Sequence, residues 1–156
     1  MTDHLATIEW RRGDQAFSDN RYSRGHVWTF DGGAVVRGSS APTSVPLPYS
    51  DPAGVDPEEA MVASLSSCHM LWFLSLAAKD GWVIDRYLDA ASGELDRDAA
   101  GRRYLARVTL RPQTAFAGPA PTQAALDVLH HRAHDLCDMA NSVRATITVE
   151  ASISSP

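Results

Sequence analysis

The sequence predicts a single α+β domain over residues 1–156. Short segments in which apolar and polar residues alternate occur in both halves of the chain, as half-buried strands require. Two longer segments carry helix start signals. A chain of this length can bury one substantial core, and it contains no internal repeat or evident linker that would divide it. Strands that precede, separate and follow two helices are typical of an α+β arrangement.

The N-terminal part is expected to form an antiparallel meander. Residues 7–11 and 26–30 alternate and predict two strands. Residues 31–33, Asp-Gly-Gly, form a hairpin signal that leads into a third strand at 34–37. Residues 38–55 hold four prolines, so they predict an extended loop, and a loop of this length is often functional.

A long helix is expected to begin at Asp56 and to end before Gly81. Asp56 can cap the helix, Pro57 suits its first position, and the next two glutamates complement the positive end of the helix dipole. Residues 60–78 lack charge and are long enough to span a bilayer. Serines and a histidine interrupt this segment, however, and polar residues precede and follow it in the sequence. A helix that is apolar all round also suits the centre of a soluble fold or a subunit interface, so we expect no membrane span.

The C-terminal half predicts a long hairpin, a second helix and a closing strand. The hairpin consists of a strand at 82–94, a turn at 96–102 and a partner strand at 104–112. Residues 119–122 start the second helix, and residues 143–153 form the last strand. The apolar stripe of the second helix is expected to contain Ala125, Leu126, Leu129, Ala133, Leu136 and Cys137.

Charge and cysteine content restrict the function classes. The net charge of −5 provides no basic surface of the kind that nucleic-acid-binding proteins carry, so no nucleic-acid partner is expected. The N-terminus shows neither a basic nor an apolar signal region, and a cytoplasmic location is expected. In that compartment Cys68 and Cys137 are more often reduced, catalytic or redox-active than joined in a static disulfide.

Three simpler interpretations of these residues stay open. Each cysteine can serve as a small buried hydrophobic residue. A zinc site would use the histidines, but the chain has no paired CxxC or HExxH, so no metal is expected. A serine hydrolase would need a G-x-S-x-G elbow, which is missing. The histidines available for a metal are His69, His130, His131 and His134.

Residues 56–70, DPEEAMVASLSSCHM, resemble the central helix of the OsmC/Ohr superfamily (osmotically inducible protein C and organic hydroperoxide resistance protein). The shared features are an Asx-Pro-Glu opening, small residues, and a cysteine ten positions after the glutamate, here Glu58 and Cys68. Cys137 near the end of the last helix, ahead of a terminal strand, matches a second signature of the family. Asp138 follows it, where many relatives have proline. The order of elements agrees over nearly the whole chain.

The resemblance implies a fold of antiparallel sheets wrapped around a long buried central helix, in an intertwined homodimer. It implies a thiol-dependent peroxidase that reduces organic hydroperoxides without a metal or organic cofactor. Cys68 would be the nucleophile and Cys137 the resolving thiol. Glu58 would hold an arginine that stabilises the Cys68 thiolate, and Arg24 is favoured over Arg21 for this role. An external dithiol, for instance of the lipoyl type, would reduce the resulting disulfide.

Two alternatives to the peroxidase remain at this point. The chain could be a non-enzymatic binding or structural dimer whose cysteines serve packing, or a different thiol enzyme in which His69 or His134 acts as the base for Cys68. One geometric constraint holds in the peroxidase case. Ten residues of continuous helix separate Glu58 from Cys68 by about 15 Å, so another residue must bridge them.

Overall fold

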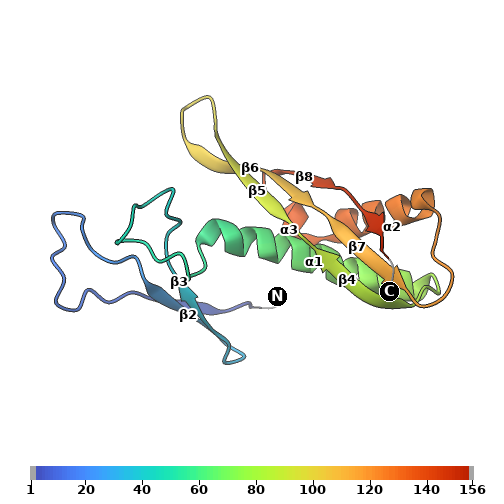
Figure 1. The fold of residues 1–156 in the computed structure, drawn as a ribbon, viewed down its shortest axis with the longest axis horizontal. Coiled ribbons are helices and arrows are strands. Elements are labelled where there is room, and N and C mark those ends of the chain that lie inside the picture. Colours follow the sequence, from blue (N-terminus) through green and yellow to red (C-terminus); the bar gives the residue numbers. More distant parts are fainter. Residues whose placement is uncertain (1–2, 155–156) are drawn as a thin grey trace. The chain divides into compact units, whose positions relative to one another are not determined.

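The structure is a computed structural model that describes residues 3–154. Contacts within the chain gather into two compact units, the first ending at Ala60 and the second beginning at Met61. The first unit holds a three-stranded sheet and the start of a long helix, and the second holds the remaining elements (Figure 1). A single domain over 1–156 therefore stays a prediction.

The sheet of the first unit is the antiparallel meander that the sequence predicts. Its strands are β1 (Ala6–Glu9), β2 (His26–Phe30) and β3 (Val35–Gly38), in the order β1-β2-β3. The β2–β3 turn contains Gly33 with a φ of 85°, a left-handed conformation that glycine adopts without strain. The loop that follows is irregular and returns to β3 through a single bridge between Gly38 and Val55.

The long helix α1 (Pro57–Lys79) begins and ends where its local signals predict. The Glu59 N–H donates to Asp56 Oδ1 at 2.8 Å, and the Asp56 N–H donates to Glu59 Oε2 at 3.1 Å, which forms a reciprocal capping box. Gly81, with a φ of 84°, follows its end. By length and composition α1 could cross a membrane, but core helices of soluble proteins pass the same test. Its buried residues are Leu65, His69, Phe73, Leu76 and Ala77.

The second unit contains two three-stranded sheets. One has the order β4 (Ile84–Asp89), β7 (Pro112–Phe116) and β9 (Ser152–Ile153). The other has the order β5 (Ser92–Arg97), β6 (Arg103–Leu110) and β8 (Thr146–Val149). The pairs β4–β7 and β5–β6 are antiparallel, whereas β8 and β9 join β6 and β7 in parallel. The chain is thus α+β with mixed sheets.

The expected hairpin strands are each divided in two, which corrects the sequence prediction. The strand expected at 82–94 becomes β4 and β5, and the partner expected at 104–112 becomes β6 and β7. Both strands of the hairpin pass from one sheet to the other near Arg111, and hydrogen bonds stabilise this crossing. The Arg111 N–H donates to Asp89 Oδ1 at 2.6 Å, and Arg111 Nη1 donates to Ser92 Oγ at 2.8 Å. The strand expected at 143–153 is likewise divided into β8 and β9.

The buried face of the second helix differs from the apolar stripe that the sequence predicts. Helix α2 (Gln123–Leu136) starts at its cap Thr122, as expected, but Leu136 is exposed and His130 is buried instead. Ala125 also lies on the exposed side. Cys137 ends α2 rather than lying within it, and its Sγ accepts the Ala140 N–H at 3.3 Å, which caps the short helix α3 (Asp138–Asn141).

Helices α1 and α2 share one hydrophobic core. Phe73 of α1 packs with Leu126 and Leu129 of α2 and with Phe116 of β7. The two helices run beside each other along the strands of the second unit (Figure 1). This packing brings together the two helices that carry the cysteines.

Candidate active site

The two cysteines, 69 positions apart in sequence, meet in the second unit. Both are free; Cys68 is partly buried on α1, and Cys137 is only 1% exposed at the end of α2. Burial and, after it, the neighbouring Cys68 thiol raise the pKa of the Cys137 thiol to about 11. The Ala140 N–H opposes this shift because it stabilises the thiolate. A protonated buried thiol therefore lies against a more accessible sulfur.

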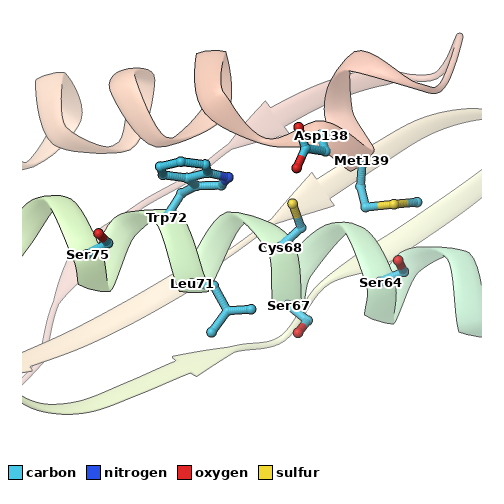
Figure 2. A pocket seen from close by; sticks show the side chains of 8 residues that line it. All are labelled: Ser64, Ser67, Cys68, Leu71, Trp72, Ser75, Asp138 and Met139. Atoms are coloured by element: carbon cyan, nitrogen blue, oxygen red, sulfur yellow. The ribbon is translucent and has the colours of Figure 1, made fainter. Parts of the chain in front are cut away.

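A cavity of about 520 Å³ opens beside Cys68. Its lining consists of Ser64, Ser67, Cys68, Leu71, Trp72, Ser75, Asp138 and Met139. The Cys68 sulfur points across the cavity toward α3, with the indole of Trp72 on one side and Met139 on the other (Figure 2). Small hydroxyl groups and apolar side chains thus surround a thiol that reagents can reach.

The remaining predicted site residues lie in the first unit. Arg24 and Glu58 line one cavity of about 510 Å³, and Arg21 does not line it. Within residues 3–154 no ion pair joins Arg24 to Glu58. Arg24 instead donates to the Asn20 backbone and side chain, at 3.0 and 2.7 Å, while Arg21 Nε donates to Tyr49 Oη at 2.9 Å. The shared cavity favours Arg24 as the partner of Glu58, and the roles of both remain predictions.

Aromatic side chains that the sequence reasoning did not single out form one wall of this cavity. The rings of Phe17 and Tyr22 stack at 4.7 Å between centroids, and Trp10 meets the Tyr22 ring edge-on at 5.3 Å. The Arg24 guanidinium lies 3.9 Å from the Tyr22 ring centroid, and it also donates to the Tyr22 carbonyl oxygen. Arg24 is therefore held by contacts within its own loop.

A buried histidine pair joins α1 to α2. His69 Nε2 and His130 Nδ1 are hydrogen-bonded at 2.9 Å, and the rings are 1% and 2% exposed. Burial lowers the pKa of His69 to about 4 and that of His130 to about 3. His134 nearby lowers the pKa of His69 further, while Asp89 opposes the shift. Both histidines are therefore neutral near pH 7.

The outer nitrogens of this pair, His69 Nδ1 and His130 Nε2, have no hydrogen-bond partner within the described residues. His69 and His130 were both weighed as metal ligands from the sequence, and His69 was also a candidate base for Cys68. A signal for burial was available for His69, which lies four residues from both Leu65 and Phe73 and so shares their helix face. Over residues 3–154 no cluster of three or more His, Cys, Asp or Glu side chains is arranged to hold a metal ion.

A family model described as OsmC-like protein matches residues 50–152 of this chain. An OsmC-like protein of unknown function from Vibrio cholerae superposes with a TM-score of 0.94 at 47% identity, over 97% of this chain and 100% of that one. No curated protein matches the chain significantly.

Two solved structures named as organic hydroperoxide resistance proteins share the fold at lower identity. The one from Elizabethkingia anophelis has a TM-score of 0.72 at 17% identity, over 100% of this chain and 98% of that one. OhrB of Bacillus subtilis has a TM-score of 0.64 at 18% identity, over 98% of both chains. The family model covers residues 50–152, which include both cysteines, and the Vibrio cholerae protein is 47% identical along nearly the whole chain. This chain therefore belongs to the OsmC-like protein family.

Proposed function

We propose that this protein is a thiol-dependent peroxidase that reduces organic hydroperoxides. One observation carries the proposal: a reachable thiol, Cys68, lines an open cavity that is partly apolar, and it lies beside a second, buried free thiol, Cys137. The first sulfur can attack a peroxide, and the second is already beside it to close a disulfide. The names of the hydroperoxide resistance proteins that share the fold agree with this chemistry.

The first step is attack of the Cys68 thiolate on one peroxide oxygen. The O–O bond breaks, Cys68 becomes a sulfenic acid, and the leaving alkoxide takes a proton to become an alcohol. In the second step the Cys137 sulfur attacks the sulfenic sulfur, a disulfide forms, and the sulfenic oxygen leaves as water with the Cys137 proton. A raised pKa suits Cys137 to this order, because the buried thiol stays protonated while Cys68 reacts.

Completion of the cycle needs groups from outside the second unit. Glu58 is proposed to orient Arg24, whose guanidinium favours the Cys68 thiolate and the developing charge on the peroxide oxygens. A dithiol of the lipoyl type is proposed to attack the disulfide and to leave as its own cyclic disulfide, which restores both thiols. A cytoplasmic homodimer is proposed, in which a second copy covers apolar side chains of α1 such as Leu71, 61% exposed in the single chain.

The competing proposal is a non-enzymatic binding dimer, since the 47%-identical relative has unknown function. A thiol count separates the two. The reduced protein receives one equivalent of cumene hydroperoxide, and free thiols are counted before and after, with mass spectrometry of the product. The peroxidase loses both thiols and gains a Cys68–Cys137 disulfide. Two thiols that survive unchanged for minutes would refute the peroxidase and favour the binding protein.

A further inference from the structure

One side chain at the Cys68 cavity carries a charge. The lining residues other than Asp138 are serine, cysteine, leucine, tryptophan and methionine. The Asp138 carboxylate is exposed, and among residues 3–154 no cation pairs with it. Figure 2 shows this carboxylate on α3, the element toward which the Cys68 sulfur points. A reagent bound in this cavity therefore shares it with the Asp138 carboxylate.

Hydrogen bonds fix the backbone that holds this carboxylate. Asp138 is the first residue of α3, which Cys137 caps through its Sγ. The Asn141 N–H donates to the Cys137 carbonyl oxygen at 3.0 Å, and Ser142 Oγ donates to the Asp138 carbonyl oxygen at 2.7 Å. Because Cys137 is buried at the start of this turn, Asp138 cannot move far from the cavity without moving the resolving thiol.

We propose that Asp138 makes the Cys68 site selective for uncharged organic hydroperoxides over those that carry a carboxylate. The inference rests on the proposed function and names its substrate class. Trp72 and Met139 provide apolar contacts for a hydrocarbon group, and they would accept a neutral ester or a free acid equally well. The Asp138 carboxylate discriminates between them, because it repels a second negative charge in the same cavity.

The size of the effect follows from Coulomb's law. Two unit negative charges about 7 Å apart, at an effective dielectric between those of a protein surface and of water, change a rate on the order of five-fold. Salt at about 1 M, where the screening length is about 3 Å, should remove most of that difference. A steric effect of the same side chain would not respond to salt.

The first test reads selectivity at Cys68 without requiring peroxidase activity. Cys68 is alkylated with neutral iodoacetamide and with anionic iodoacetate, and mass spectrometry follows modification of that cysteine. Asp138→Asn keeps the size of the side chain and removes its charge. It should raise the iodoacetate-to-iodoacetamide rate ratio about five-fold at low salt and hardly at all at about 1 M salt. The same thiolate attacks both reagents and displaces iodide from each, so the ratio cancels any change in thiolate fraction.

Asp135→Asn is the matched control, since Asp135 is also acidic and exposed, lies three positions before Asp138 and is absent from the cavity lining. It should leave the ratio unchanged. An equal ratio in the wild type and Asp138→Asn overturns the proposal. So does a higher iodoacetate-to-iodoacetamide ratio in the wild type than in Asp138→Asn, because repulsion by Asp138 predicts the opposite sign.

The second test uses the substrate itself. Below their micelle concentrations, kcat/KM is measured for a fatty-acid hydroperoxide and for its methyl ester, which differ in the charge of the carboxyl end and in one methyl group. The wild type should favour the ester, and Asp138→Asn should reduce that preference, by no more than the change in the alkylation ratio, because the carboxylate lies farther from the reacting group. An unchanged preference refutes the role of Asp138. If no variant consumes any hydroperoxide, the proposed function fails, while the alkylation ratio still decides the role of Asp138.

Discussion

Acidification from pH 7 to about pH 5 should destabilise the second unit through the His69–His130 pair. In the unfolded chain each histidine has a pKa of about 6.5. In the folded protein burial lowers these values to about 4 and about 3. Above pH 6.5 both states are neutral, so the pair contributes no pH dependence. Below pH 6.5 the histidines bind protons in the unfolded chain but not in the folded protein. The free energy of unfolding therefore falls as the pH falls, until the pH reaches the folded-state pKa values.

The magnitude follows from these values. At about pH 5 each histidine removes about 2 kcal/mol from the free energy of unfolding, and the pair removes about 4 kcal/mol. Both folded-state values lie below pH 5, so both rings stay mostly neutral in the folded protein at that pH. It is a large part of the roughly 5–15 kcal/mol that stabilises a typical domain.

Urea unfolding at pH 7 and at pH 5, followed by circular dichroism at two protein concentrations, measures this loss. The carboxyl groups of Asp51, Asp80 and Asp98 have pKa values below the usual 3.8, so the stability that they contribute is lost only at lower pH. The double variant His69→Leu/His130→Leu should lose most of the pH 7 to pH 5 dependence. His131→Gln, at a ring that is 77% exposed, is the control and should retain it. Equal pH dependence in the wild type and the double variant would refute the reasoning.

Three further predictions concern the thiols and the helix start. Cys137→Ser should consume one equivalent of hydroperoxide and then stop in stopped-flow assays, because the Cys68 sulfenic acid has no partner; continued turnover with a dithiol would contradict the resolving role. Arg24→Gln should slow oxidation of Cys68 at least ten-fold in the same assay, while Arg21→Gln changes it little; equal effects would remove the preference for Arg24. Asp56→Ala should lower the free energy of unfolding by about 1 kcal/mol in denaturant titrations, since it removes the α1 cap, and an unchanged midpoint would contradict that contribution.

Local signals predicted much of the secondary structure. The turn at 31–33 and the capping residues of α1 gave correct elements, because each depends on backbone chemistry within a few residues. The divided strands were missed. Alternation looks the same on either side of a change of sheet, and the bonds of Asp89 and Arg111 that mark this change join residues 22 positions apart.

The residues of the candidate site likewise fall into those that the sequence predicted and those that only the structure revealed. The two cysteines and the pair of Arg24 and Glu58 were named from spacing and from family resemblance, and the structure adds the contact between the thiols. Neither the buried histidine pair nor the position of Asp138 at the cavity was predicted. Periodicity can assign a residue to a helix face, but it does not say which other helix packs against that face.

The sequence by itself thus determined the meander, the capped central helix and the positions of the reactive side chains along the chain, because these depend on neighbouring residues. Only the tertiary structure decided that Cys68 meets Cys137, that His69 bonds His130, and that Asp138 lies at the cavity. The packing of α1 on α2 brings these residues together, and packing between distant segments leaves no local pattern in either one.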